Sequence, residues 1–573
     1  MSRRVSLGKG ITVSATRRLR GFLAVCLVIM LSVSIMPNRA QAADGDLDPT
    51  FGVGGKVVTD FFGSTDEASA VVLQPDGKII AVGEAFGSSG AFNFGLARYD
   101  GSGNPDPAFG TGGKVTTDFF GLNDQAFAAA LQPDGKIVVA GTVAQNIGNS
   151  NFGLARYDSS GNLDPAFGAG GKVTTDLFNS TDQASEIVLQ PDGKIIVVGS
   201  TSPIGSGLFD FAVARYDGSG NLDPTFGAGG KVTADFSGSS DRAAAVALQP
   251  DGKIVVAGSN FSTSTGLSDF ALVRYDGSGN PDPAFGTGGK VTTDFSGSNG
   301  QAGARALALQ PDGKIVVAGF VVQDIGGLNF ALARYDSNGS LDSTFGIGGK
   351  VTTDLFGSTD QAFAMALQPD GKIVVAGSTM MGSLADFALV RYDGSGNLDP
   401  AFGAGGKVAT DFSVSFDAAF AIALQPDGKI VAAGATIPRG LVGEIVNPSI
   451  DFALARYQST PACTLSLTNA SVDKPVLWPA NHKMVPVNIS YNVNNTCPTN
   501  CTLSVSSNEP INGTGDGDTA PDWQVVNANR VNLRAERAGN GSGRIYTIGI
   551  TCRDSAGNAA GRTVTVSVPH DRR

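Results

Sequence analysis

Residues 249–258 read Gln-Pro-Asp-Gly-Lys-Ile-Val-Val-Ala-Gly, and this stretch decides the fold. The first five residues of the stretch occur seven times, at intervals of 58, 58, 59, 61, 58 and 57 residues, beginning at Gln74, Gln132, Gln190, Gln249, Gln310, Gln368 and Gln425. Such a fixed period is typical of chains built from repeated supersecondary units. The Asp-Gly pair between two apolar runs predicts a tight hairpin, because glycine supplies the positive φ that such turns need.

Each repeat contains four segments with the chemistry of a strand. In the fourth repeat these are residues 243–249, 254–257, 270–275 and 289–294. The second segment is apolar and mostly β-branched, as expected of a strand buried on both faces. The first segment is rich in alanine, which suits a strand crowded near a central axis. Four strands in about 58 residues, repeated seven times without a helical period, predict an all-β fold: a seven-bladed β-propeller.

The two ends of the repeat region predict how the ring closes. The chain has a fourth-strand segment at residues 47–60, before the first complete repeat, and the seventh repeat ends after its third strand at residues 456–457. We therefore expect the N-terminal strand to complete the last sheet, which removes an exposed sheet edge. The alternative is an open β-solenoid, in which that edge stays unpaired.

The repeats resemble the delta-60 repeat of secreted bacterial proteins, a β-propeller family. The phrases Leu-Gln-Pro-Asp-Gly-Lys-Ile and Phe-Ala-Leu-Ala-Arg-Tyr-Asp carry the resemblance, which covers roughly residues 44–458. The resemblance implies the propeller fold and no particular activity.

The first 42 residues have the pattern of a signal peptide. A basic start is followed by an apolar run at residues 21–36 and by Ala40-Gln41-Ala42, a small-x-small cleavage pattern. We expect export and a secreted or cell-surface location, with an uncleaved N-terminal anchor as the alternative. No other apolar stretch reaches spanning length. Without the seven Lys and Arg of this segment, 34 basic residues face 52 acidic ones, a net charge of −18 that disfavours nucleic-acid binding.

The predicted domains are therefore a signal peptide at 1–42, the propeller at 43–458 and a different domain at 459–573. Residues 485–491, 544–551 and 562–568 of the last domain alternate like sandwich strands. The phrases at 477–483, 508–510 and 568–571 resemble the immunoglobulin-like domains of bacterial surface proteins, which implies adhesion or spacing. Its four cysteines predict two disulfides with three possible pairings, among Cys463, Cys497, Cys501 and Cys552.

Three groups of acidic residues are candidate cation sites. Asp516, Asp518 and Asp522 could bind calcium or could form an exposed acidic loop. The loops between the fourth strand and the next repeat carry Asp66, Asp124, Asp182, Asp241, Asp360 and Asp417, which either cap their turns or bind a cation. The Asp-x-Ser-x-Asn-x-Asp pattern that begins at Asp100 fits a hairpin turn or a calcium loop.

The function expected from these patterns is non-catalytic binding or a structural role. The loops after each second strand differ between repeats, and variable loops on a rigid scaffold are common recognition sites. The expected partner is an extracellular protein or a glycan, with calcium as the only candidate ion. The seven Arg-Tyr pairs, from Arg98-Tyr99 to Arg456-Tyr457, are interpreted as packing between blades, with the guanidinium reaching solvent. The alternative is a secreted hydrolase or lyase acting on polysaccharide, which needs an asymmetric cluster of charged residues near the axis.

Overall fold

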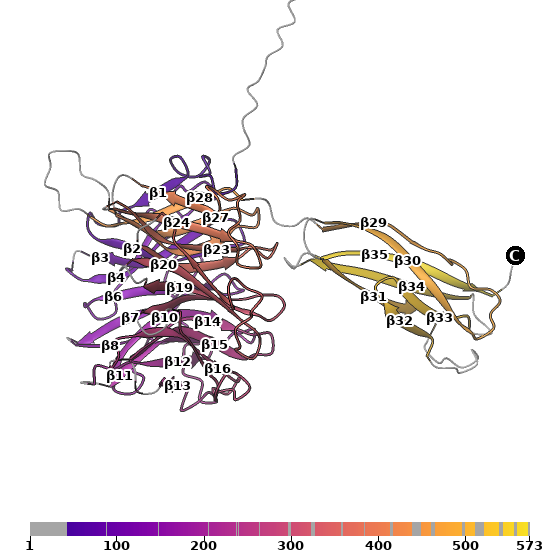
Figure 1. The fold of residues 1–573 in the computed structure, drawn as a ribbon, viewed down its shortest axis with the longest axis horizontal. Coiled ribbons are helices and arrows are strands. Elements are labelled where there is room, and N and C mark those ends of the chain that lie inside the picture. The colour runs from indigo at the N-terminus through magenta and orange to yellow at the C-terminus, as the bar shows by residue number, and fades with distance from the viewer. Residues whose placement is uncertain are drawn as a thin grey trace, which may run out of the picture. The chain divides into compact units, whose positions relative to one another are not determined.

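The computed structural model describes residues 43–570, except for residues 88, 147, 204–205, 237, 239, 263, 296–299, 323–326, 357–358, 383, 413–415, 438–448, 460–464, 496–498, 510–520, 538–542 and 555–558. Every helix or strand among the described residues is a strand, which confirms the all-β prediction (Figure 1). None of these residues belongs to a helix long and apolar enough to cross a membrane. The predicted signal peptide lies outside the described residues.

Residues 56–457 form seven four-stranded antiparallel sheets. In the order of hydrogen-bonded neighbours the sheets are β2 (Asp66–Leu73), β3 (Ile79–Phe86), β4 (Phe92–Tyr99), β5 (Lys114–Thr117); β6 (Asp124–Leu131), β7 (Ile137–Asn146), β8 (Asn149–Tyr157), β9 (Lys172–Thr175); β10 (Ser180–Leu189), β11 (Ile195–Pro203), β12 (Asp210–Tyr216), β13 (Lys231–Ala234); β14 (Ser240–Leu248), β15 (Ile254–Phe261), β16 (Ser268–Tyr275), β17 (Lys290–Thr293); β18 (Ala302–Leu309), β19 (Ile315–Val322), β20 (Leu328–Tyr335), β21 (Lys350–Thr353); β22 (Asp360–Leu367), β23 (Ile373–Met381), β24 (Leu384–Tyr392), β25 (Lys407–Thr410); and β26 (Asp417–Leu424), β27 (Ile430–Thr436), β28 (Asp451–Tyr457), β1 (Lys56–Thr59).

The last sheet takes its fourth strand from the N-terminal end of the described chain (Figure 1). Strand β1 pairs antiparallel with β28, and Lys56 lies opposite Ala455. The same register recurs inside the first repeat, where Lys114 lies opposite Ala97. Beyond the strand, the backbone amide of Asp48 donates to the carbonyl of Arg456 at 2.7 Å. The N-terminal segment therefore occupies the place that β5 occupies in the first sheet.

The first strands of the seven sheets contact one another in a cycle. The order of contact is β2, β6, β10, β14, β18, β22, β26 and back to β2. Buried side chains fill the space between successive sheets, including the space between the last sheet and the first. There Leu454 and Val431 pack with Ile79 and Ala97. Because apolar surface is covered on both faces of every sheet, the middle strands are almost wholly buried.

An arginine from each third strand ties a sheet to the next one. Arg98 forms an ion pair with Asp106 at 2.9 Å, lies 4.5 Å from the ring of Phe109 and donates to the carbonyl of Ser159 in the following repeat. Arg456 repeats this arrangement across the two ends of the region, with Asp48 at 2.8 Å and Phe51 as the ring. The predicted packing role is thus confirmed, but the guanidinium is buried instead of reaching solvent. Its carboxylate partner lies in the turn that follows the third strand, so the charge is neutralised inside the protein.

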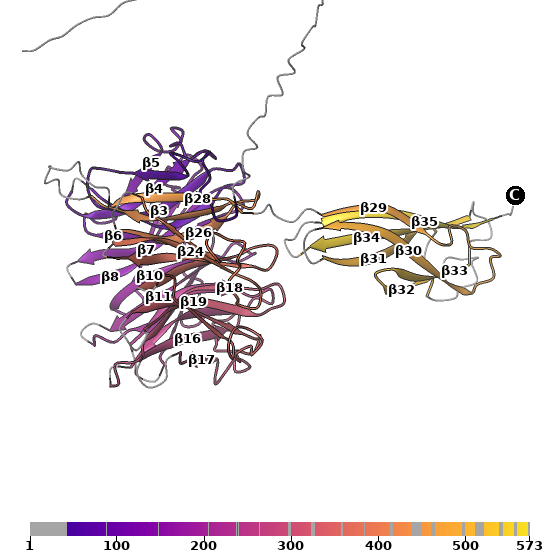
Figure 2. The ribbon, with the colours of Figure 1, turned by 45° about the horizontal axis from the view of Figure 1, so that its top comes forward.

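Residues 465–569 form two further antiparallel sheets (Figures 1 and 2). One contains β29 (Leu465–Val472), β30 (Met484–Asn495), β33 (Arg530–Arg534) and β32 (Trp523–Asn527), and the other contains β31 (Thr499–Ser507), β34 (Gly543–Asp554) and β35 (Ala559–Pro569). Both sheets contribute to one buried cluster, in which Val487 and Leu533 meet Ile548 and Val566. This packing is that of a two-layer β structure, as the alternating strands predict.

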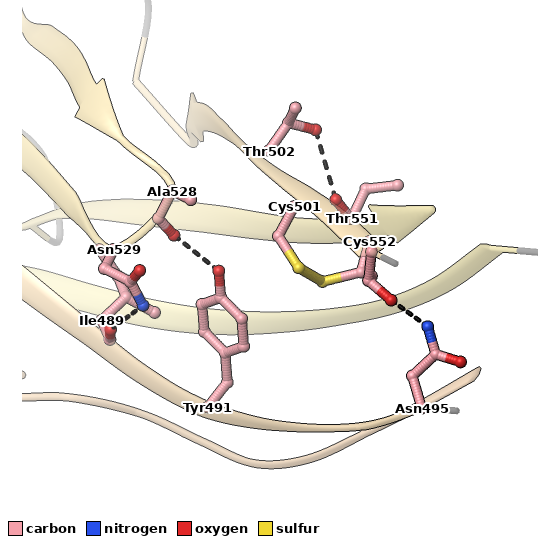
Figure 3. The surroundings of a disulfide bond; sticks show 10 residues. Ile489, Tyr491, Asn495, Cys501, Thr502, Ala528, Asn529, Thr551 and Cys552 are labelled. Atoms are coloured by element: carbon pink, nitrogen blue, oxygen red, sulfur yellow. Dashed lines mark hydrogen bonds between the residues drawn. A yellow bond between two sulfur atoms is a disulfide. The ribbon is translucent and has the colours of Figure 1, made fainter. Parts of the chain in front are cut away.

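A disulfide joins two strands of the three-stranded sheet (Figure 3). Cys501 of β31 lies directly opposite Cys552 of β34, and the two are bonded. This bond confirms one of the two predicted disulfides and selects one of the open pairings. Cys463 and Cys497 lie outside the described residues.

Replacing Cys501 and Cys552 together by alanine should lower the free energy of unfolding of this region by about 3–4 kcal/mol, because the bond closes a loop of 51 residues. Trp478 and Trp523 are the only tryptophans of the chain, so urea unfolding of the full chain followed by tryptophan fluorescence isolates this transition. Thr502→Ala, beside the bond, is the control and should unfold like the wild type. An unchanged midpoint in the double variant would contradict the stabilising role of the bond.

Candidate functional site

Each first strand of the seven sheets carries a β-bulge that turns one side chain toward the centre of the ring. In β2 the register shifts between Ala68 and Ala70, and the residue between them has no partner on β3. Gly83 lies opposite this bulge, and a Cβ atom there would lie 1.8 Å from the carbonyl oxygen of Glu67. The strand therefore needs glycine at this position, and a bulge is a common device for re-aiming a side chain.

The seven bulge residues all line one cavity of about 410 Å³, which we call the axial cavity. They are Ser69, Phe127, Ser185, Ala244, Arg305, Phe363 and Phe420. Each comes from a different sheet, so the seven first strands encircle the cavity. Thr142 and Ser200 on β7 and β11 also line it. Those two residues lie just past the middle of the second strands, in the half from which the variable loops leave.

A further set of lining residues lies two positions before the bulge. In this set Glu67, Gln125, Gln183 and Arg242 line the axial cavity. A smaller adjoining cavity of about 180 Å³ shares Arg305 with it and is lined by the residue after each bulge. That residue is alanine in six strands and Glu186 in β10. The repeat therefore places charged side chains at the axis in some sheets only, and the centre of the ring is asymmetric.

Burial and mutual repulsion disfavour the charged form of the acidic side chains at the axis. Glu67 lies directly opposite Glu84 on the neighbouring strand. Burial, with the repulsion from Glu84, raises the pKa of Glu67 to about 7. Burial also raises the pKa of Glu84, although the Gln125 amide donates to its carboxylate. For Glu186, burial raises the pKa to about 7. Acids with a pKa near neutrality are frequent at functional sites.

Two arginines on neighbouring first strands face the same cavity. The guanidinium of Arg242 donates to the Gln183 side-chain oxygen at 2.8 Å and lies 3.9 Å from the ring of Phe209. Arg305 lies 5.6 Å from the ring of Phe320, which fills the space left by Gly303. Burial and the charge of Arg242 lower the pKa of Arg305. Among the described residues neither guanidinium forms an ion pair, in contrast to the seven structural arginines.

The sequence analysis does not identify this cluster, because the patterns that it singles out, such as the Arg-Tyr pairs, recur from repeat to repeat, whereas the axial charges do not. The signal was present seven residues before each Gln-Pro-Asp-Gly-Lys, where the sequence reads Glu67, Gln125, Gln183, Arg242, Gly303, Gln361 and Ala418. The residue type at this position differs between repeats, as it does at Glu186 and Arg305, and all these positions lie around the axis of the ring. An asymmetric charged cluster near the axis, which the enzyme alternative needs, is thus present.

The aspartates that begin the first strands cap their turns, as one of the two interpretations predicts. Asp66 accepts a hydrogen bond from the Phe61 amide at 2.7 Å, and Asp124 accepts one from the Phe119 amide at 2.7 Å. Three such positions also gather three carboxylates within 4.8 Å, namely Asp60, Asp66 and Asp451; Asp210, Asp235 and Asp241; and Asp386, Asp411 and Asp417. Burial raises the pKa of Asp66 to about 7 and that of Asp451 to about 6, so protons can relieve the repulsion there.

The Asp100 turn also satisfies its own carboxylate. Oδ1 accepts hydrogen bonds from the amides of Ser102 and Asn104, at 2.8 and 2.9 Å, and Oδ2 accepts one from the Asn104 side chain. The same pattern recurs at Asp158 and Asp217. This geometry is that of a hairpin turn with an Asx hydrogen bond.

The predicted calcium residues fall partly outside the described chain. Asp516 and Asp518 lie outside it, whereas Asp522 is buried beside β32. One oxygen of Asp522 accepts a hydrogen bond from Arg544 at 2.8 Å. Arg544 is fully buried and also pairs with Glu509 and Glu536, so a guanidinium already offsets part of this negative charge. Calcium binding at these aspartates stays a prediction.

Two larger grooves lie between neighbouring sheets of the ring. One, of about 820 Å³, is lined by Phe236 and Lys290, and the other, of about 540 Å³, is lined by the equivalent Phe61 and Lys114. In both, the lysine donates to the carbonyl of the aspartate that precedes the phenylalanine. Because equivalent residues of different repeats line both grooves, neither groove is specific to one place in the ring. The axial cavity, whose lining differs between repeats, is therefore the candidate site.

Six segments of the chain match the model of the domain of unknown function (DUF5122) beta-propeller. They are residues 74–109, 132–167, 190–226, 249–285, 310–345 and 368–402. These six matches support a repeat β-propeller family for this part of the chain. Each matched segment begins at the hairpin turn after the first strand of a sheet, contains the second and third strands and ends before the fourth. No curated protein matches the chain.

Several solved structures share parts of the fold at low identity. A polysaccharide lyase, "PL25-Ulvanlyase bound to -[GlcA(1-4)Rha3S]-", is 13% identical, with a TM-score of 0.42, 69% of this chain covered and 95% of that chain. Polysaccharide lyase Uly1 is 13% identical, with a TM-score of 0.41 and coverage of 73% and 97%. Sqt1 from Chaetomium thermophilum is 13% identical, with a TM-score of 0.34 and coverage of 69% and 96%. At these scores the likenesses carry no conclusion about activity.

Glu67→Gln should stabilise the propeller at high pH only. The folded protein keeps the proton of Glu67 up to about pH 7, whereas the unfolded chain releases it near the ordinary value of 4.5. The stability cost of this carboxylate therefore grows as pH rises from about 4.5 to 7 and is complete above it. We expect a gain of about 1–2 kcal/mol at pH 8, reduced from the full shift because the cavity admits water, and almost none at pH 4.

Urea unfolding followed by far-ultraviolet circular dichroism measures this effect, and tryptophan fluorescence assigns the C-terminal transition. An equal gain at both pH values, or a loss at pH 8, would show that the Glu67 charge is not strained in the fold.

Proposed function

We propose that this protein is a secreted or cell-surface binding protein without catalytic activity, which holds its ligand in the axial cavity of a seven-bladed β-propeller. In this proposal residues 1–42 are a signal peptide, residues 43–458 form the propeller and residues 459–573 form an immunoglobulin-like spacer or adhesion domain. The observation that carries the proposal is the pair of axial arginines, Arg242 and Arg305, for which the described part of the chain offers no ion-pair partner.

Arg242 and Arg305 support a binding role because no carboxylate of the described residues neutralises their charges. Seven arginines of the propeller have a carboxylate partner and hold sheets together, yet Arg242 and Arg305 repel each other across neighbouring strands. Their guanidinium groups lie on the wall of a cavity, where they could form ion pairs that the described residues do not supply. A ligand of complementary charge would supply those interactions, which is the usual reason for strain at a site.

The variable loops support the same location. Thr142 and Ser200, which line the axial cavity, lie just past the middle of the second strands, in the half from which the variable loops leave. The loops that leave the ends of the second strands differ in sequence, for example residues 203–209 and 261–267. A ligand seated at the axis would therefore have loops of different shape within reach.

A second candidate function is a hydrolase or lyase acting on polysaccharide. The observation that favours it is the pair Glu67 and Glu186, whose pKa values near 7 suit a general acid or base. One assay distinguishes the two functions, because an enzyme produces new chain ends in the polysaccharide that it binds. Retention of intact polysaccharide supports the binding protein.

A variant that fills the axial cavity tests the binding function directly. Ser185→Trp places a large ring in the axial cavity, and Ser102→Trp places the same ring on an exposed hairpin turn as the control. In a glycan and protein binding screen with the full chain, we expect ligands of the wild type to be retained by Ser102→Trp. The same ligands should bind Ser185→Trp at least tenfold more weakly.

Two results would count against the proposal. Ligands held equally by Ser185→Trp would place recognition outside the axial cavity. A screen in which the wild type retains nothing would remove the support for a binding function.

A further inference from the structure

The side chains around the axial cavity also define the chemistry of its ligand. The cavity combines three phenylalanine rings, several uncharged polar side chains and two guanidinium groups that form no ion pair with any residue the structure describes. These groups come from different sheets and meet only at the axis. The inference below rests on the proposed binding function and specifies the class of ligand.

The arginine pair requires an anion. Arg242 donates one hydrogen bond, to Gln183, and the described residues leave the other donors of its planar guanidinium for a ligand. Arg305 lies near enough for its pKa to be lowered by the charge of Arg242. A carboxylate between two such groups forms charge-assisted hydrogen bonds and removes their repulsion. Both guanidinium groups also face an aromatic ring, which fixes their planes.

The phenylalanine rings require an apolar body next to that anion. Phe363 and Phe420 pack edge to face, with ring centroids 5.0 Å apart, and Phe127 lines the same cavity from another sheet. All three are bulge residues, as is Arg305, so the backbone presents the rings and this arginine at one level of the ring of strands. Phenylalanine offers no polar atom, so these faces bind a ring or an aliphatic chain.

The acidic side chains limit the charge of the ligand. Glu67 and Glu186 line the two adjoining cavities, and Glu84 lies behind Glu67. A second anionic group that extended past the arginines would meet these carboxylates. A cavity of about 410 Å³ takes a small molecule and not a folded partner.

We propose that the axial cavity binds a small monocarboxylate that carries one or two rings, with the carboxylate between Arg242 and Arg305 and the ring body against Phe127, Phe363 and Phe420. Gln125 and the serine hydroxyl groups of the wall accept or donate hydrogen bonds to hydroxyl substituents on such rings. The carboxylate gives the affinity, and the phenylalanines select the ring.

Two isosteric probes test the class of ligand. 1-Naphthoate carries the carboxylate, and 1-naphthylmethanol has the same ring and nearly the same shape without the charge. In ligand-observed NMR titrations of the full chain, we expect naphthoate to bind at least tenfold more tightly than the alcohol. Arg242→Gln and Arg305→Gln should each lower naphthoate affinity about tenfold and leave the alcohol unchanged.

Lys253→Gln is the matched control, because it removes one positive charge from the hairpin at the far end of β14. It should bind naphthoate like the wild type. Circular dichroism checks that each variant is folded, and neither substitution removes an ion pair among the described residues or leaves a carboxylate there without its partner.

Three other results would overturn the inference, and each refutes a different part of it. Equal binding of the two probes, blocked by Ser185→Trp, would leave the axial cavity a binding site but refute the carboxylate. Tighter binding of naphthoate that survives both arginine variants would place the anion elsewhere. Absence of binding by either probe at 10 mM, a concentration on the order of the weakest specific affinities, would refute the ligand class, and the screen with Ser185→Trp would then decide the binding function separately.

Discussion

The pairing of β1 with β28 is the constraint on which the rest of the repeat region depends. Without β1 the last sheet would have three strands, and β28 would expose a row of unpaired backbone groups. The pairing is reinforced by the buried ion pair of Arg456 with Asp48. Although burial opposes it, hydrogen bonds from Thr50 and the charges of Lys429 and Arg456 lower the pKa of Asp48 to about 2. The closing interaction therefore persists over the whole physiological pH range.

The closed order of the sheets is what creates the axial cavity. A first strand has a partner on only one side, so its other side faces the axis, and the bulge directs one residue of each strand there. Residues far apart in sequence, such as Glu67 and Arg305, then line one space. Small side chains such as Ser69, Ser185 and Ala244 leave room in that space, and the large or charged ones make its lining asymmetric. The residues that recur in every repeat build the sheets, and residues that differ between repeats give the axial cavity its charged and aromatic groups.

Much of this fold follows from the sequence, because its signals are local and repeated. The Asp251-Gly252 pair predicts the hairpin between β14 and β15, and the offset of the fourth-strand segment predicts that β1 completes the last sheet. The buried state of Arg98 does not follow, since it depends on Asp106 and on the carbonyl of Ser159 in the next repeat. The axial cluster was equally hidden. Its members are ordinary surface residue types, and only the bulge and the closed ring show that Arg242 and Arg305 face one cavity. The pairing of Cys501 with Cys552 likewise needs the register of β31 and β34.

Hydrogen exchange of the full chain, read by mass spectrometry on short peptides, tests the closing pair most directly. The account predicts that amides in residues 451–457 exchange as slowly as those of the equivalent strand at residues 92–99, and that residues 56–59 are protected like residues 114–117. Exchange of residues 56–59 and 451–457 within seconds, beside slow exchange in the six other sheets, would contradict it.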